Sequence, residues 1–261
     1  MARVFITGSA DGLGLVAARQ LVAAGHQVML HARNAARADD ARRALPQADA
    51  VAVGDAAELA AMRHLAEQVN AWGRCDAVIH NVGVGSRDPR GETAGGLSRL
   101  FAVNVLAPYV LTALIVRPKR LVYLSSGLHS GGDPALDDPQ FARRRWNGSQ
   151  AYADSKLLDV MLAFAVARLW PDVRSNAVTP GWVPTRMGGR GAPENLEDGA
   201  ATQVWLAVSS DPAAQVSGAY WYHRQQREAH PAARDVAKQD ALLAYCAEVS
   251  GVGLASAREA G

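Results

Sequence analysis

The chain contains little cysteine and no long apolar run. Only two cysteines, Cys75 and Cys246, occur among its 261 residues, so neither a disulfide framework nor a cysteine-rich metal site is expected. No apolar stretch is long enough to span a bilayer, and the first residues do not have the pattern of a secretory signal. These absences predict a protein without a membrane span that acts in a reducing, cytoplasmic setting.

Charge of one sign is also scarce. The formal net charge is +2, and the basic runs 42–43 and 143–145 are short. Such runs are typical of a solvated surface rather than of a nucleic-acid-binding stripe. The seven histidines show no metal-ligand spacing, so no metal site is expected. The sequence therefore argues against nucleic acid as a partner and favours a small-molecule ligand.

Strand and helix patterns alternate along the chain. Short apolar runs bounded by turn residues predict strands, and longer stretches with apolar residues at helical spacing predict helices. The expected strands are 3–6, 27–32, 51–53, 77–80, 120–124, 175–178 and 217–221, and the expected helices are 15–24, 35–44, 58–71, 97–116 and 151–169. This order predicts an α/β fold, namely a single-domain, Rossmann-like, doubly wound parallel sheet of about seven strands.

One domain is expected to account for residues 1–261. No repeat, low-complexity tract or linker interrupts the sequence, and its length is ordinary for one α/β domain. The segment 223–261 is charged and alanine-rich. Its apolar patch 241–245 predicts a C-terminal extension that packs on the domain.

A glycine-rich turn follows the first expected strand. Gly8, Gly12 and Gly14 have the spacing G-x-x-x-G-x-G, and a helical pattern begins at Leu15. Glycine lets the backbone approach a pyrophosphate closely, and the free N–H groups of a helix N-terminus attract that anion. Strand, glycine turn and helix in this order predict a dinucleotide site. The turn alone is a weak signal, because any strand-to-helix connection can contain glycine.

Tyr152 and Lys156 lie four residues apart inside the expected helix 151–169. Residues at this spacing share one helix face, and an ammonium beside a phenol favours the phenolate. A tyrosine in that environment can give or take a proton near neutral pH. Taken alone, the pair is explained equally well as a chance surface arrangement.

Together these motifs resemble the short-chain dehydrogenase/reductase family. The matching residues occur in the family's order between about residues 2 and 222: Thr7-Gly8-x-x-x-Gly12-x-Gly14, Asn81-Val82-Gly83, Asn104, Ser125-Ser126, Tyr152-x-x-x-Lys156 and Pro180-Gly181. The stretches 124–129 and 180–189, and the long separation between Ser126 and Tyr152, are similar to the retinol dehydrogenase and WW-domain oxidoreductase branch.

The resemblance implies an oxidoreductase that transfers a hydride between a nicotinamide and a carbonyl/alcohol pair. Tyr152 would be the general acid/base, and Lys156 would assist it and hold the nicotinamide ribose. Ser126 would hydrogen-bond the substrate oxygen. Asn104 would hold a water on a proton relay to the lysine, and it is also explained as a polar residue that caps a local backbone irregularity. The implied cofactor-binding residues are Gly8, Ser9, Asp11, Gly12, Leu13, Gly14, Arg33, Asp55, Ala56, Asn81, Val82, Gly83, Tyr152, Lys156, Pro180, Gly181, Val183 and Thr185.

The end of the second expected strand bears on the choice of cofactor. It reads His31-Ala32-Arg33-Asn34 and lacks the acidic residue that binds the ribose diol of NAD. Arg33 is placed to meet a 2′-phosphate through charge-assisted hydrogen bonds, so NADP(H) is expected in preference to NAD(H). A solvent-exposed arginine is the alternative interpretation. Asp55 matches the family's adenine-contacting aspartate, and it is also a candidate helix N-cap.

Two segments, 127–151 and 185–195, are expected to flank the open end of the nicotinamide site. Trp146, Trp182 and Met187 suggest a bulky hydrophobic carbonyl substrate. A surface tryptophan that packs on its own loop is the alternative interpretation. His129 matches the pattern of this branch and is expected to be a structural histidine with its hydrogen bonds satisfied. The connection 116–120 is shorter than this branch usually has, and the helix before it is a common subunit interface in the family, so a homo-oligomer is left open.

Two other functions fit the same fold. One is a non-catalytic, NADP(H)-sensing regulatory protein, although such regulators usually lack the Tyr–Lys pair. The other is a reductase of a carbon–carbon double bond, because protochlorophyllide reductase has similar motifs. Turnover of aldehydes, ketones and enones would separate the three functions.

Overall fold

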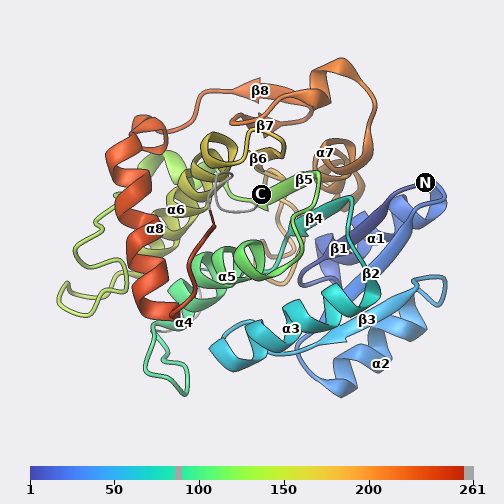
Figure 1. The fold of residues 1–261 in the computed structure, drawn as a ribbon, viewed down its shortest axis with the longest axis horizontal. Helices are drawn as coiled ribbons and strands as arrows, with labels where there is room; N and C mark the ends of the chain where they lie inside the picture. The colour runs from blue at the N-terminus through green and yellow to red at the C-terminus, as the bar shows by residue number, and fades with distance from the viewer. Residues whose placement is uncertain (86–89, 256–261) are drawn as a thin grey trace.

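The fold is built on one sheet. A computed structural model describes residues 1–85 and 90–255 (Figure 1), and its eight strands follow the order β3-β2-β1-β4-β5-β6-β7-β8. Their bounds are β1 Arg3–Ile6, β2 Gln27–Ala32, β3 Ala50–Val53, β4 Ala77–His80, β5 Arg120–Leu124, β6 Arg174–Val178, β7 Tyr220–Tyr222 and β8 Gln225–Arg227. Strands β1 to β7 pair in parallel, and β8 pairs antiparallel with β7 at one edge.

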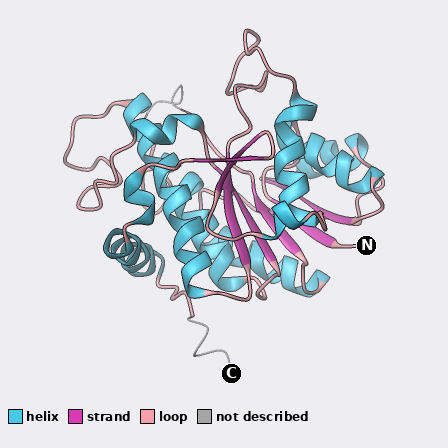
Figure 2. Ribbon diagram, turned by 90° about the horizontal axis from the view of Figure 1, so that it is seen from above, coloured by secondary structure: helices cyan, strands magenta, loops and turns pink. Residues whose placement is uncertain are grey.

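Helices cover both faces of the sheet (Figure 2). The α-helices are α1 Gly12–Ala23, α2 Ala35–Ala44, α3 Leu59–Trp72, α4 Arg99–Phe101, α5 Ala107–Leu114, α6 Gly148–Leu169, α7 Leu196–Val208 and α8 Val236–Ser250. Helices α1, α2 and α7 share one face, whereas α3, α5 and α6 share the other, with α8 packed on the outside of α6. This arrangement explains why most strand residues on both faces are apolar.

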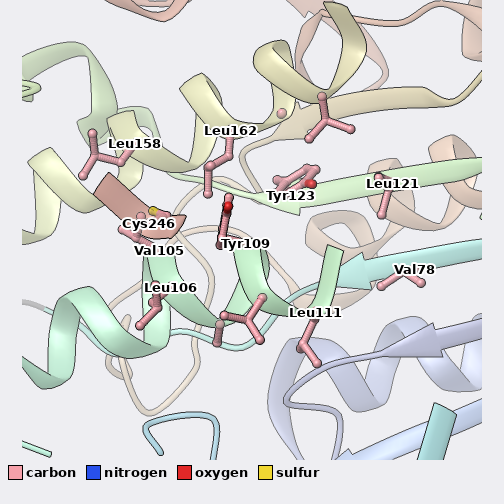
Figure 3. Packing of buried hydrophobic residues seen from close by; sticks show 14 of the residues in the cluster. Val78, Val105, Leu106, Tyr109, Leu111, Leu121, Tyr123, Leu158, Leu162 and Cys246 are labelled. Carbon is pink, nitrogen blue, oxygen red and sulfur yellow. The ribbon is translucent and has the colours of Figure 1, made fainter. Parts of the chain in front are cut away.

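Two hydrophobic cores hold the layers together, one on each face. The larger one joins α3, α5 and α6 to the sheet and to α8. Figure 3 shows part of it, with Leu158 and Leu162 of α6 close to Tyr109 of α5 and to Cys246 of α8. Leu162 is 1% exposed and Cys246 is 0% exposed, so the last helix contributes directly to the core.

The region 97–116 is not the continuous helix that the sequence predicts. It consists of α4, a five-residue π-helical segment η1 at Ala102–Leu106, and α5. Asn104 lies in the π-helical segment, is fully buried, and hydrogen-bonds to the backbone N–H and carbonyl of Val84 and to Ser155 Oγ. π-Helical turns of this kind occur frequently at functional sites.

Other differences concern elements that lack a clear sequence pattern. The seven expected strands are present as β1 to β7. The additional edge strand β8 was not predicted, because it reads Gln-Gln-Arg and has no apolar alternation. Helix α7 was not predicted. The last parallel strand is Tyr220–Tyr222 rather than 217–221, while α1 begins at Gly12 and α6 at Gly148. The rest of the expected strands and helices agree with the structure to within one or two residues at each end.

The C-terminal extension contains β8, the 3₁₀ turn η4 at Pro231–Arg234 and α8. Arg168 of α6 donates to Gln239 Oε1 of α8 at 3.0 Å, and Leu242 is 0% exposed within the larger core. The described part of the extension therefore lies against α6. The final residues of the expected extension, 256–261, fall outside the described ranges.

Candidate active site

A cavity of about 1360 Å³ lies along the carboxyl ends of the parallel strands. It includes the point where the strand order reverses between β1 and β4, which is where doubly wound sheets bind ligands. The cavity brings together most of the residues proposed from the sequence. Those lining it are Gly8, Asp11, Gly12, Leu13, Gly14, Arg33, Asp55, Ala56, Asn81, Val82, Gly83, Ser126, Tyr152, Lys156, Pro180, Gly181, Val183 and Thr185.

Ser9 and Asn104 do not line the cavity. Both are fully buried behind its wall. Ser9 Oγ donates to the carbonyl of Ile6 at 2.8 Å and accepts from the N–H of His31 at 2.9 Å. Asn104 holds the backbone of Val84 from both sides. These two residues therefore support the cavity wall from behind. The sequence pattern could not distinguish a supporting residue from one that contacts the ligand.

The glycine turn fits a closely approaching phosphate group. Gly8 has φ +63°, and a Cβ there would lie only 2.8 Å from Val82 Cα. A Cβ at Gly14 would lie 2.5 Å from the carbonyl oxygen of Gly8 and 2.6 Å from Asn81 Nδ2. Only glycine leaves this cradle open. The Asp11 side chain does not cap α1, so the first N–H groups of that helix face the cavity uncapped.

Side chains from neighbouring strands hold the turn in place. Asn81 Nδ2 donates to the carbonyls of Thr7 and Gly8 at 3.0 and 3.1 Å. His31 Nδ1 accepts from the N–H of Gly8, and its Nε2 contacts the carbonyl oxygen of Gly54, each at 2.8 Å. Burial lowers the pKa of His31, consistent with a neutral ring whose two nitrogens are both used.

The end of β2 carries positive charge toward the cavity. Arg33 is exposed and lines it, and no acidic residue stands at the strand end. Arg37, which was not proposed from the sequence, also lines the cavity and pairs with Asp11 at 2.5 Å. Arg37 follows Arg33 by only four residues, so the sequence already contained a second arginine close to the strand end. Asp55 lines the cavity and also accepts from the N–H of Ala57 at 2.9 Å, in the turn before α3.

Ser126, Tyr152 and Lys156 meet at the other end of the cavity. The Lys156 ammonium lies 6.0 Å from the centre of the Tyr152 ring. Ser126 Oγ accepts from the N–H of Leu128 at 3.2 Å, which leaves its hydroxyl hydrogen free for another acceptor. The structure thus joins two segments that are 26 residues apart in the sequence.

Lys156 is deeply buried and has a carboxylate partner. Its ammonium donates to the carbonyl of Leu124 at 2.8 Å and to Asp159 Oδ2 at 2.7 Å. Asp159 was not proposed from the sequence, although its i+3 spacing from Lys156 places it on the same face of α6. A third polar residue on that face of a mainly apolar helix is the sequence signal that could have identified Asp159.

The open end of the cavity is apolar. Leu128, Trp182 and Met187 line it while remaining 58%, 57% and 37% exposed. Trp146, which was expected here, is not among the described lining residues. Its ring packs edge-on against Phe141 at 5.6 Å in a small cluster that also contains Val84 and Tyr152. The expected influence of Trp146 on the substrate end of the cavity stays a prediction.

His129 connects the segment after Ser126 to the C-terminal extension. Its Nδ1 lies 2.8 Å from the carbonyl oxygen of Ser126, and its Nε2 accepts from the N–H of His230 at 3.3 Å. The ring is buried, and burial lowers its pKa. These contacts describe a structural histidine whose ring nitrogens are both hydrogen-bonded.

Across residues 1–85 and 90–255, no group of three His, Cys, Asp or Glu side chains is arranged to hold a metal ion. In the same ranges, every helix is too short or too polar to cross a bilayer.

A doubly wound sheet with a glycine-lined cavity at its switch point is typical of a dinucleotide-binding protein. A family model described as short chain dehydrogenase matches residues 2–196. The chain therefore belongs to the short-chain dehydrogenase family, as its motifs predict.

Relatives of known name agree with this assignment. The chain is 45% identical over 259 residues to an uncharacterized oxidoreductase of Emericella nidulans, covering 97% of this chain and 99% of that protein. It is 41% identical over 260 residues to the short-chain dehydrogenase chry4 of Gibberella zeae, covering 98% and 100%. It is 30% identical over 275 residues to retinol dehydrogenase 14 of Homo sapiens, covering 89% and 81%. The predicted likeness to the retinol dehydrogenase branch is confirmed.

Solved structures share the fold. A protein of Mycobacterium paratuberculosis matches with a TM-score of 0.82 and 26% identity, covering 98% of this chain and 95% of that one. A blue fluorescent protein from a metagenomic library, solved with NADPH, matches with a TM-score of 0.67 and 23% identity, covering 84% and 94%. The α/β, Rossmann-like fold class expected from the sequence is confirmed.

Proposed function

We propose that this protein is an NADP(H)-dependent oxidoreductase that interconverts a hydrophobic carbonyl compound and its alcohol. The observation that carries the proposal is that Ser126, Tyr152 and Lys156 line the same cavity as the glycine turn. A proton donor, an oxygen-binding hydroxyl and a phosphate-binding cradle are the three groups that such a reaction needs.

Tyr152 acts on the proton in this mechanism. In reduction its hydroxyl gives a proton to the carbonyl oxygen, and in oxidation the phenolate takes the proton from the alcohol. The Ser126 hydroxyl donates a hydrogen bond to the same substrate oxygen, because its own Oγ is already held by the Leu128 N–H. When bound, the nicotinamide supplies or accepts the hydride.

Lys156 and Asn104 organise this end of the site. Two of the three ammonium protons of Lys156 are directed to Leu124 and Asp159, which leaves one for the ribose or the tyrosine. Asn104 is assigned to the catalytic set as the residue that fixes Val84 and widens the helix beside Ser155. Its side-chain N–H groups are both used in these contacts, so a relay water would have to meet another atom.

The dinucleotide would lie along the remaining lining residues. The uncapped N–H groups at Gly12 to Gly14 would hold the pyrophosphate, and Asp55 would contact the adenine. Arg33 would meet the 2′-phosphate that distinguishes NADP from NAD. Arg37 of α2 lines the same end of the cavity, where it pairs with Asp11 and Asp40.

The apolar mouth supports a hydrophobic small-molecule substrate. Leu128, Trp182 and Met187 present large apolar side chains to solvent around the cavity, and covering such surface with a ligand is favourable. The similarity to human retinol dehydrogenase 14 supports the alcohol/carbonyl class.

The buried free thiols of Cys75 and Cys246 support a reducing, cytoplasmic setting.

The test is turnover by the purified full chain. Aldehydes, ketones and enones of increasing apolar size are offered with NADPH and, in parallel, with NADH, and the absorbance of the reduced nicotinamide is followed. We expect reduction of bulky apolar carbonyl compounds with a preference for NADPH. Turnover of enones alone would identify a double-bond reductase instead. Tight NADPH binding without turnover of any substrate class would identify a sensing protein.

A further inference from the structure

The charged ammonium group of Lys156 lies in the protein interior. Its side chain is only 5% exposed, and burial by itself favours the neutral amine. Water is therefore not available to solvate the ammonium, so the protein must supply both acceptors and a counter-charge. The proposed catalytic lysine needs the positive charge to favour the phenolate of Tyr152.

Asp159 supplies the counter-charge. Its side chain is 3% exposed, and Oδ2 lies 2.7 Å from Lys156 Nζ. Within residues 1–85 and 90–255 it is the sole carboxylate paired with this ammonium. Tyr152, Lys156 and Asp159 follow one another at spacings of i+4 and i+3, so they stand in a row along one face of α6.

We propose that Asp159 is a positioning residue that keeps Lys156 both protonated and fixed in direction beside Tyr152. The Leu124 carbonyl and the Asp159 carboxylate hold two of the ammonium protons. The third proton then points away from the Asp159 side, toward the cavity that Lys156 lines. The catalytic part of this inference rests on the proposed function, whereas the charge state of Lys156 does not.

Among residues 1–85 and 90–255, the other groups near the pair carry no competing charge. Tyr123 of β5 faces Asp159, and burial raises the pKa of its phenol. Tyr220 of β7 faces Tyr152, and burial raises its pKa as well. Asn104 of the π-helical segment faces Ser155 and is uncharged. Burial raises the pKa of Asp159 to about 6, while its charge raises the pKa of Lys156 against the opposing effect of burial.

The small number of lysines permits a direct experiment on the protein without any substrate. The chain has three lysines, Lys119, Lys156 and Lys238, so labelling with ε-¹³C-lysine gives three Cε signals whose shifts report protonation. Lys119 and Lys238 are well exposed and serve as internal references. In the wild-type protein we expect Lys156 to lose its proton at a pH no lower than theirs. A Lys156 that titrates below both references would overturn the proposal.

The Asp159→Asn variant removes the charge and keeps the side-chain size. We expect Lys156 to lose its proton at a pH lower by about one unit or more, the usual effect of removing an adjacent opposite charge. Asp159→Glu should return the titration toward the wild-type position. An unchanged Lys156 titration in a folded Asp159→Asn protein would mean that Asp159 does not hold the charge.

Asp154→Asn is the matched control on the same helix. Asp154 is also buried, but it pairs with Arg144 at 3.3 Å and accepts from the N–H of Asp133 at 2.8 Å. It lies on a different face of α6 from Lys156. We expect the Lys156 signal of this variant to titrate as in the wild type, and an equal shift in both variants would show a general loss of buried charge instead.

The pH profile of alcohol oxidation tests the link to the proposed function. If Lys156 becomes neutral in Asp159→Asn, it no longer favours the Tyr152 phenolate, and the rising limb of the oxidation rate should move to higher pH. A limb that moves to lower pH would contradict the proposal, because it would mean that Asp159 mainly opposes the tyrosinate charge. If neither protein turns over any alcohol, the proposed function fails while the lysine titration still decides the role of Asp159.

Discussion

Ser125 and Ser126 are adjacent in the sequence, yet their hydroxyl groups have different partners. Ser125 Oγ donates to the carbonyl of Lys156 at 2.7 Å and is buried, so it ties β5 to α6. Ser126 Oγ accepts from the N–H of Leu128, and within the described part of the chain its hydroxyl hydrogen has no acceptor. This difference supports Ser126 as the residue that would contact a substrate oxygen.

The role proposed for Tyr152 predicts the effect of removing one oxygen atom. Tyr152→Phe keeps the ring in the cluster with Val84 and Trp146 but removes the proton donor. Turnover should fall about 10²-fold or more, as expected for the loss of a general acid, while NADPH affinity should persist. Steady-state kinetics and a fluorescence titration of NADPH measure the two quantities. Wild-type turnover by the variant would rule out the mechanism.

The choice between cofactors depends on Arg33. A charge-assisted hydrogen bond contributes about 1.5–3 kcal/mol, so Arg33→Ala should weaken NADPH binding about tenfold or more and leave NADH binding nearly unchanged. Arg42→Ala is a suitable control, because Arg42 is an exposed arginine of α2 paired with Asp39 outside the cavity lining. Equal losses for NADPH and NADH would show that Arg33 does not contact the 2′-phosphate.

At the scale of a single element, the π-helical segment η1 has the most direct effect on the candidate active site. The Asn104 side chain hydrogen-bonds to the backbone of Val84, which follows β4, and to Ser155 of α6. These hydrogen bonds satisfy its side chain in a fully buried position. A continuous α-helix from 97 to 116 would not give Asn104 the same contacts, and the wall of the cavity would change with it.

Replacement of Asn104 should therefore affect stability as well as activity. Asn104→Ala leaves the N–H and carbonyl of Val84 without partners, and a buried group that loses its partner costs about 1–3 kcal/mol. We expect the free energy of unfolding in urea to fall by about that amount or more. Asn147→Ala, which removes only the exposed cap contact with Gln150 at the start of α6, should have the smaller effect. A larger loss for Asn147→Ala would contradict this account of the π-helical segment.

At the scale of the whole molecule, α8 and the residues after it lie against the region formed by α4, η1 and α5, which the family resemblance implies is a common subunit interface. The hydroxyl of Tyr109 donates to the carbonyl of Val252 at 2.8 Å, and Phe101 packs edge-on against Tyr245 at 5.6 Å. Figure 3 shows Cys246 of α8 close to Val105 and Tyr109. Residues that are already buried within one chain are not available for a subunit contact.

This covered face predicts a monomer in solution. We expect a mass near 27.6 kDa from size-exclusion chromatography with light scattering at micromolar concentration. Addition of NADPH should leave the mass unchanged, because the cavity lies at the strand ends and away from α8. A dimer or tetramer at low concentration would contradict the prediction.

The same packing predicts that α8 unfolds together with the rest of the chain. Leu242 is 0% exposed in the larger core, so Leu242→Ala should lower the free energy of unfolding by about 2–5 kcal/mol. A single urea transition seen equally by tryptophan fluorescence and by far-ultraviolet circular dichroism is expected for wild type and variant. Two separate transitions would contradict the proposal that residues 1–261 form one domain.

The sequence by itself determined the order of strands and helices, the glycine turn and the Tyr152–Lys156 pair. Each of these depends on residues close together in the chain, where a period of two or of 3.6 residues and the need for glycine at a close approach are directly legible. The arrangement of Tyr152, Lys156 and Asp159 along one helix face also depends only on nearby residues. Asp159 could therefore have been identified from its spacing alone.

Only the tertiary structure decided which distant groups meet and which are hidden. It brought Ser126 to Tyr152, packed Trp146 against Phe141, and placed Tyr245 of α8 against Phe101 of α4. It also made a π-helical segment around Asn104 and added β8 to the sheet edge. These outcomes depend on which surfaces fit together when layers far apart in the sequence pack, and the free energy of that packing is a property of the whole fold rather than of any short segment.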